Sequence, residues 1–258
     1  MGIEILKRLT PEEEELAAKR EELARLEAQL ADEELALASL KAEMAGFEGL
    51  YLRRVGVLYA ELDDWNARLA ELKAATAATP KASVEAAEAR AQANESYSAA
   101  HCEAAEVQLF APSPDLKRLF LDAAKRVHPD TASDDADRAR RERLMKEVNA
   151  AYAAGDEDAL RRIFAGLDSS PDAVQGSGTG ADLVRVLRQL RLVKDRLIAI
   201  TIELAALAET DIALLKAKSD TAASQGLDLL AQMEVDIRGR ISAVRQIFEQ
   251  TAGGEARA

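Results

Sequence analysis

Large apolar residues recur at every seventh position over the first third of the chain. The series runs Leu9, Leu16, Leu23, Leu30, Leu37, Met44, Tyr51, Leu58, Trp65 and Leu72. A heptad rhythm is typical of a coiled-coil helix, whose apolar stripe packs against a partner helix. The start is favourable, because Pro11 suits a first turn and Glu12 and Glu13 suit the positive end of the helix dipole. We therefore predict a coiled-coil helix over residues 9–78.

The second apolar position of each heptad lies on one side of the main stripe early in this helix and on the other side later. The residues that fill it are first Leu26, Leu40 and Phe47, and then Val55, Leu62 and Leu69. The switch lies near Gly46 and Gly49. Such a break in the heptad phase predicts a bend or a local change in the packing face.

A second heptad rhythm occupies the C-terminal part of the chain. Its apolar residues mostly alternate spacings of four and three, as the two core positions of a coiled coil do. They are Val186, Leu190, Val193, Leu197, Ile200, Leu204, Leu207 and Leu214, followed after a polar stretch by Leu230, Ile237, Ile241, Val244 and Phe248. We predict a second long helix over residues 182–250.

The two long helices have similar predicted lengths and stand at opposite ends of the chain. The first, on the order of 100 Å long, would not be stable without a partner helix. We therefore predict an all-α fold, a long antiparallel coiled-coil helical hairpin with a small helical module inserted at its far end. The alternative is a parallel homodimeric coiled coil that uses each helix separately, and dimerisation of hairpins also stays open.

Proline and glycine divide the segments between the long helices. Pro80 ends the first helix, and an Ala-rich connecting helix is predicted over residues 81–110. Two further prolines lead into the inserted module, which occupies residues 113–167. Residues 168–181 are rich in Gly and Ser, so we predict a flexible linker between the module and the second long helix.

The inserted module is predicted to contain three short helices. In the first, residues 116–127, the apolar residues share one face. These residues are Leu116, Leu119, Phe120, Ala123 and Val127. Pro129 disfavours helical backbone at the residue before it, so the helix ends there. A second amphipathic helix follows over residues 136–154, closed by Gly155, and a third over residues 158–166.

Four cations lie off the apolar face of the first module helix. They are Lys117, Arg118, Lys125 and Arg126. The tripeptide His128-Pro129-Asp130 follows this helix directly, in the loop to the second one. Two antiparallel helices that display this tripeptide in their connecting loop resemble the J-domain, the part of Hsp40 (DnaJ-type) co-chaperones that activates Hsp70. The resemblance covers residues 113–167, a J-like domain.

The resemblance implies a partner and a role for each of these residues. In the J-domain family the loop and the basic helix dock on a DnaK-type Hsp70, near its nucleotide-binding domain and interdomain linker, and speed ATP hydrolysis. His128, Pro129 and Asp130 would then form the trigger, with Asp130 offering a carboxylate to a cation of the partner. Pro129 would keep the loop stiff, and the four cations would steer the approach of an acidic surface.

Two departures from the family pattern limit what the resemblance implies about fold and function. J-domains usually begin with a short helix, and here two prolines stand at that place. This helix is therefore missing or replaced by the end of the connecting helix, and we expect the module to depend on its stalk for stability. The Gly/Phe-rich, Cys-rich and β-sandwich parts that bind clients in the family are also absent, so the coiled coil would have to choose the client.

Composition excludes several other classes of function. The net charge of −12 argues against nucleic acid as a partner. The single cysteine, Cys102, excludes a disulfide within the chain, and with His101 and His128 it is too little for a four-ligand zinc site. No apolar run reaches the roughly 18 residues of a membrane span, and the N-terminus lacks a signal-peptide core, so we expect a cytoplasmic protein. No phosphate loop, nucleophile elbow or metal-ligand cluster occurs, so we expect neither an enzyme nor a cofactor.

The leading hypothesis is a J-domain co-chaperone that stimulates the ATPase of Hsp70, with a coiled coil that selects a client or a location. The alternative is a structural or scaffold protein whose J-like module is a docking domain without effect on ATP hydrolysis. The client or scaffold bound by the coiled coil, the oligomeric state and peripheral association with a membrane all stay open.

Overall fold

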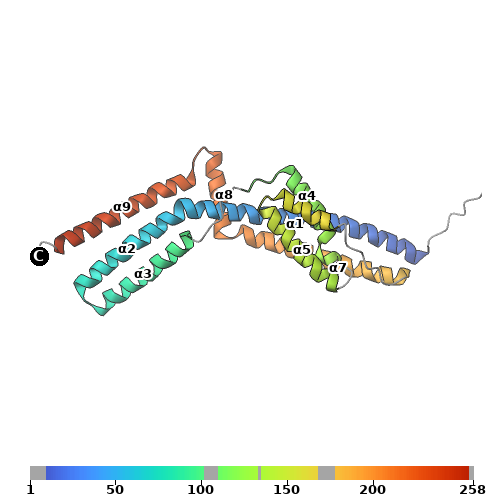
Figure 1. The fold of residues 1–258 in the computed structure, drawn as a ribbon, viewed down its shortest axis with the longest axis horizontal. Helices are drawn as coiled ribbons and strands as arrows, with labels where there is room; N and C mark the ends of the chain where they lie inside the picture. The colour runs from blue at the N-terminus through green and yellow to red at the C-terminus, as the bar shows by residue number, and fades with distance from the viewer. Residues whose placement is uncertain (1–9, 102–109, 133–134, 168–177, 256–258) are drawn as a thin grey trace, which may run out of the picture. The chain divides into compact units, whose positions relative to one another are not determined.

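The protein is all-helical over the residues that the structure describes, as the two heptad rhythms predict (Figure 1). The structure, a computed structural model, describes residues 10–101, 110–132, 135–167 and 178–255. The chain divides into two compact units, and both are discontinuous in the sequence. The first unit comprises Met1–Glu43 and Phe110–Glu209, and the second unit comprises Met44–Leu109 and Thr210–Ala258.

The N-terminal heptads form one helical run. Helix α1 (Pro11–Tyr51) continues through a π-helical turn, η1 (Leu52–Gly56), into α2 (Val57–Ala77). Reciprocal hydrogen bonds close its start: Thr10 Oγ1 accepts from the Glu13 amide at 3.3 Å, and Glu13 Oε2 accepts from the Thr10 amide at 2.8 Å. This arrangement satisfies two backbone donors that the first helical turn leaves without a partner.

In the first unit, α1 pairs with α7 (Thr179–Ala208). Their buried core joins Leu16, Leu23, Leu30 and Leu37 of α1 to Val186, Leu190, Val193 and Ile200 of α7. The pair is parallel, because contacts between the helices advance together along both. Arg20 of α1 reaches Asp182 at 3.0 Å, and Lys41 reaches Glu203 at 3.1 Å. The predicted antiparallel hairpin is therefore wrong for this pair.

In the second unit, α2 pairs on one side with α3 (Pro80–His101), which runs antiparallel to it. Arg90 of α3 binds Asp64 at 2.7 Å and Glu71 at 2.8 Å, and Ser96, further along α3, reaches Asp63, further back on α2, at 2.6 Å. The connecting helix predicted over residues 81–110 corresponds to α3 as far as residue 101, and residues 102–109 lie outside the described residues.

On another side, α2 and the π-helical turn pair with α9 (Leu229–Glu255), which runs parallel to them. Arg54 binds Glu234 at 2.6 Å, and further along both segments the rings of Trp65 and Phe248 meet edge to face, with centroids 5.7 Å apart. The apolar core of this pairing consists of Phe47, Val55, Leu62, Leu230, Ile237 and Ile241. The coiled-coil partner of the N-terminal run thus changes from α7 to α9 along its length, in keeping with the predicted change in packing face.

The C-terminal heptads form three helices, so the single helix predicted over residues 182–250 is also wrong. Between α7 and α9 lies α8 (Asp211–Ser224), whose start is capped by Thr210, with Oγ1 accepting from the Ala213 amide. Before α9, Gly226 has a φ of 75°, a conformation that favours glycine and ends a helix. Thr210 and Gly226, which lie at these two breaks, are residue types that favour helix ends over a continuing helix.

The direction of pairing was mispredicted because an apolar stripe packs equally well against a parallel or an antiparallel neighbour. Matched length carries no information about direction either. The direction depends on how the chain connects the end of the first apolar stripe to the start of the second. Here α3 runs back along α2, and the inserted module follows before α7 begins beside the start of α1 (Figure 1).

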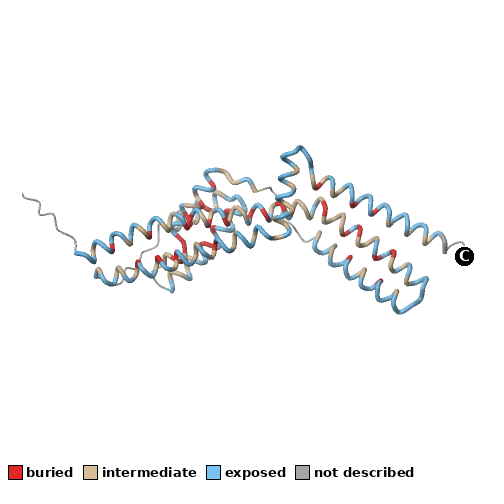
Figure 2. The backbone as a smooth tube through the Cα atoms, turned by 180° about the vertical axis from the view of Figure 1, so that it is seen from behind, coloured by how far each residue is buried: buried red, intermediate tan, exposed pale blue. Residues whose placement is uncertain are grey.

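The inserted module folds as a small helical domain within the first unit. It comprises α4 (Pro114–Val127), a 3-10 turn η2 (Pro129–Thr131), α5 (Asp135–Ala153) and α6 (Glu157–Leu167). Its buried core contains the apolar residues expected for the two longer helices, including Leu116, Phe120, Ala123, Val127, Met145, Val148 and Tyr152. Buried positions elsewhere follow the helix pairs as spaced stripes, as Figure 2 shows.

Candidate functional site

The His-Pro-Asp loop, His128, Pro129 and Asp130, is a tight turn that ends α4. Ser113 caps the start of α4, with Oγ accepting from the Leu116 amide at 2.9 Å. At the other end His128 is extended, with a φ of −61° and a ψ of 125°, as the following proline requires. The Thr131 amide and hydroxyl both donate to the His128 carbonyl, at 3.1 and 2.8 Å. The loop is therefore held in one compact turn.

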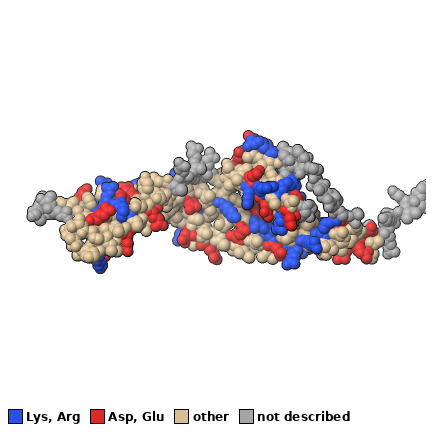
Figure 3. All heavy atoms as spheres, turned by 60° about the horizontal axis from the view of Figure 1, so that its bottom comes forward, with Lys and Arg blue, Asp and Glu red and all other residues tan. Residues whose placement is uncertain are grey.

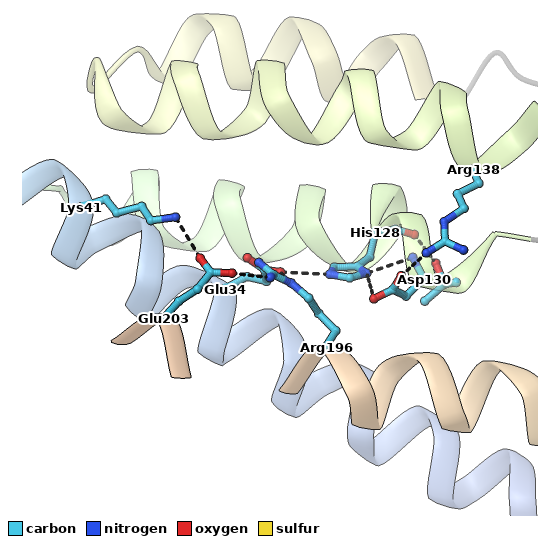
Figure 4. A network of polar contacts seen from close by, with 8 residues as sticks. Glu34, Lys41, His128, Asp130, Arg138, Arg196 and Glu203 are labelled. Atoms are coloured by element: carbon cyan, nitrogen blue, oxygen red, sulfur yellow. Dashed lines mark hydrogen bonds and ion pairs between the residues drawn. The ribbon is translucent and has the colours of Figure 1, made fainter. Parts of the chain in front are cut away.

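Two of the three residues of the loop are buried, contrary to what a docking loop would require, whereas Pro129 is half-buried. His128 is 3% exposed and Asp130 is 7% exposed. His128 Nδ1 accepts a hydrogen bond from the Asp130 amide at 3.2 Å, and Nε2 lies 3.2 Å from Oε1 of Glu34 on α1 (Figure 4). Because a backbone amide can only donate, the ring proton is on Nε2, which donates to the carboxylate.

Glu34 belongs to a chain of polar contacts, which we call the Glu34 cluster: Glu34, Lys41, His128, Arg196 and Glu203. Arg196 of α7 donates through Nε to Glu34 at 2.7 Å and through a terminal nitrogen to Glu203 at 2.8 Å. Lys41 of α1 reaches the other oxygen of Glu203 at 3.1 Å. The cluster therefore joins α1, α7 and the module through one buried carboxylate (Figure 4).

The pKa of Glu34 lies below its ordinary value. Glu34 is only 5% exposed, and burial alone would raise the pKa of its carboxyl group. The hydrogen bonds from His128 and Arg196, together with the charge of Arg196, outweigh this effect and lower it. The hydrogen bond from Arg196 likewise lowers the pKa of Glu203. Both carboxylates are therefore held in their charged form.

Further contacts tie the loop to α5 and α7. Arg138 of α5 donates to the carboxylate of Asp130 at 3.2 Å, and Arg141 donates to Thr131 Oγ1 at 2.8 Å. From α7, Gln189 reaches the Thr131 carbonyl at 3.5 Å. The carboxylate expected to meet a cation of a partner thus already has one from its own chain.

The basic residues of the predicted site, in contrast, are exposed. Lys117, Arg118, Lys125 and Arg126 all lie on the solvent side of α4. Arg118 pairs with Asp115 at 3.1 Å, and the guanidinium of Arg126 stacks 4.1 Å from the centre of the Phe164 ring. On the face drawn in Figure 3, Lys and Arg side chains are interspersed with Asp and Glu. The four cations are thus exposed, whereas His128 and Asp130 of the tripeptide are buried.

A segment of α1 packs on the core of the inserted module. Ala31 is part of the buried core of the module, and Leu35 and Ala38 pack against it. The hydroxyl of Ser39 is 2.8 Å from that of Tyr152, which is fully buried. The end of the connecting helix, expected in this role, lies outside the described residues, although Phe110 meets Tyr152 edge to face at 5.2 Å.

Sequence reasoning missed Glu34, Arg196 and the packing of α1 on the module. One signal was present, because Ala31, Leu35 and Ala38 follow at spacings of four and three on a face distinct from the main heptad stripe. Nothing in the sequence distinguishes Glu34 from the many exposed acids of α1. Its role depends on a tertiary contact with the loop.

Apart from the His-Pro-Asp loop, the described residues offer few groups that could bind a ligand. A groove of about 390 Å³ lies between α2 and α3, but its arginine, Arg90, is already bound by Asp64 and Glu71. His101 stacks on Tyr97 with ring centroids 4.0 Å apart, and Cys102 lies outside the described residues. In the part of the chain that the structure describes, no group of acidic, His and Cys side chains could hold a metal, and no helix is both long and apolar enough to cross a membrane.

Comparisons with known proteins give no neighbour. No family model matches the chain, and neither the curated proteins nor the solved structures give a significant match. The J-domain resemblance therefore depends on the chain's own residues, namely the tripeptide, the helix pair on either side of it and the exposed cations.

Proposed function

We propose that this protein is a J-domain co-chaperone that docks on a DnaK-type Hsp70 and stimulates its ATPase. The observation that carries the proposal is the position of His128-Pro129-Asp130, at the turn between two packed helices of which the first has four exposed cations. Docking would place this basic helix against an acidic surface of Hsp70. Exposed charges of this kind mainly raise the rate of association and suppress wrong partners.

In this proposal the coiled coil selects the client or the location. The two apolar side chains most exposed on α7, Ile198 and Ile202, share one helix face and contribute apolar surface to which a client could bind. The described residues contain no strands, so the coiled coil is the main surface outside the module that a client or a second copy of the chain could use.

A second candidate function follows from the burial of His128 and Asp130. In a scaffold protein the loop would be a permanent clamp between the module and the coiled coil, and the module would dock without effect on ATP hydrolysis. The contacts of His128 with Glu34 and of Asp130 with Arg138 favour this alternative, because they occupy the groups that a trigger would offer.

Single-turnover ATP hydrolysis by a purified DnaK-type Hsp70 tests the proposal. We expect stimulation by the full chain and loss of it in His128→Gln. A double variant, Lys117→Ala with Lys125→Ala, should bind Hsp70 more weakly and show a weaker dependence on salt, while keeping its helicity, because both lysines are exposed. Absence of stimulation both in the unmutated protein and in a variant with a freed loop, described below, would refute the co-chaperone function and leave the scaffold.

A further inference from the structure

We propose that the protein's own coiled coil holds the His-Pro-Asp loop in a closed state, through Glu34, and that Hsp70 can engage the loop only after this contact opens. The inference rests on the proposed co-chaperone function and adds an autoinhibitory contact to it. It assigns a role to Glu34, Arg196 and Gln189, none of which belongs to the J-like module.

In the closed state the side chains of His128 and Asp130 are already bonded within the chain. Both ring nitrogens of His128 are engaged, one by the Asp130 amide and the other by Glu34. The carboxylate of Asp130 has Arg138. With His128 only 3% exposed, a partner protein could not replace the hydrogen bond from its Nε2 to Glu34 without first separating the loop from α1.

Opening of the loop is feasible because Glu34 has a second partner. When His128 leaves, Arg196 still donates to Glu34 at 2.7 Å, so the carboxylate is not left buried without a partner. Arg196 in turn keeps Glu203, whose side chain is exposed enough to be hydrated. The coiled coil can therefore stay intact while the loop moves away from it.

Two helices that are distant in sequence, α1 and α7, hold the loop, so the hold depends on how these helices pair. Glu34 comes from α1, while Arg196 and Gln189 come from α7, and Gln189 touches the loop itself at Thr131. Any change that separates or shifts α7 against α1 would weaken the hold on the loop. Because a closed loop binds nothing, the apparent affinity for Hsp70 is reduced by the fraction of molecules that are open.

Two variants and one control test this arrangement in the full chain. Glu34→Gln removes the charge that accepts from both His128 and Arg196, and Gln189→Ala removes a contact made to the loop from α7. The control is Glu22→Gln. It removes a carboxylate that also lies between α1 and α7, where it binds Lys194 at 2.7 Å, but that does not contact the loop. Circular dichroism checks that all three keep their helicity.

The first readout is hydrogen exchange of the Asp130 and Thr131 amides, which donate to the side chain and carbonyl of His128. In Glu34→Gln we expect exchange about tenfold faster, the factor that corresponds to about 1.4 kcal/mol. Gln189→Ala should act in the same direction with a smaller factor, and Glu22→Gln should leave exchange unchanged. Unchanged exchange in both loop variants would overturn the inference.

The second readout is stimulation of single-turnover ATP hydrolysis by a DnaK-type Hsp70. At protein concentrations below saturation, Glu34→Gln should stimulate several-fold more than the unmutated chain, and adding His128→Gln should abolish the gain. Equal stimulation by the open variant and the unmutated chain would refute autoinhibition and leave the co-chaperone function standing. A loop that opens without any stimulation would instead refute the co-chaperone function, and the inference with it.

Discussion

The hydrogen bond between Ser39 and Tyr152 offers a sharp test of whether α1 completes the core of the module. The two hydroxyls are 2.8 Å apart, and Tyr152 is fully buried whereas Ser39 is half-buried. Ser39→Ala leaves the Tyr152 hydroxyl buried without this partner, which should cost about 1–3 kcal/mol of the free energy of unfolding. Tyr152→Phe should cost less, about 0.5–1.5 kcal/mol, because Ser39 can turn to water or to its own helix backbone.

The double variant is more informative than either single change. With Ser39→Ala already present, Tyr152→Phe removes the orphaned hydroxyl, so it should be neutral or stabilising. The coupling energy of the double-mutant cycle should therefore be about 1 kcal/mol or more, the size expected for residues in direct contact. A coupling energy below about 0.3 kcal/mol would refute the packing of α1 on the module.

Urea unfolding followed by circular dichroism measures the cycle. The chain offers an internal control in its single tryptophan, Trp65, which lies in the second unit. Its fluorescence reports on the core around Phe248 and not on the module. Unfolding curves from the two signals also test whether a single two-state transition describes the protein, which the use of a cycle requires.

Three further predictions concern charge, direction and backbone. Because the folded pKa of Glu34 lies below its unfolded value of about 4.3, its stabilising contribution is complete above that pH and is lost as pH falls through the folded pKa, so Glu34→Gln should flatten the acid limb of urea midpoints measured from pH 7 to pH 3. Cysteines replacing Arg20 and Asp182, in a background free of other cysteines, should be joined by a short bismaleimide within one chain, whereas an antiparallel pair would hold them at opposite ends. Gly155→Ala, at a φ of 69°, should lower the free energy of unfolding by about 1 kcal/mol, while Gly239→Ala, in open space on α9, should raise it by about 0.5–1 kcal/mol; equal effects at the two sites would contradict the backbone argument.

The sequence predicted helices better than it predicted their pairing. The helix start at Pro11 and the helix end at Gly155 were predicted, because they depend on local hydrogen bonding and backbone preference, which are properties of a few neighbouring residues. The direction of α7 against α1 depends on the path of the whole chain between them, and no local pattern encodes it. The breaks at Thr210 and Gly226 were visible as residue types, yet the apolar rhythm on either side masked them.

The same distinction applies to the candidate site. The tripeptide and the four cations were found from the sequence because each is defined by residue type and spacing. The burial of His128 was not found, because it depends on Glu34 and Arg196, which look like ordinary surface charges of a coiled coil. Such charges are usually solvated, and only a tertiary contact makes one of them a buried anchor.

The packing of the module on α1 and the burial of His128 have a common cause. Ala31, Glu34, Leu35 and Ala38 follow one another at spacings of three, one and three, so they share one face of α1. Because the module core packs on the apolar members of this face, His128 comes to lie against its acidic member. The face of α1 that stabilises the module therefore also covers His128 of the loop. Any event that loosens the module from α1 would also release His128 from Glu34.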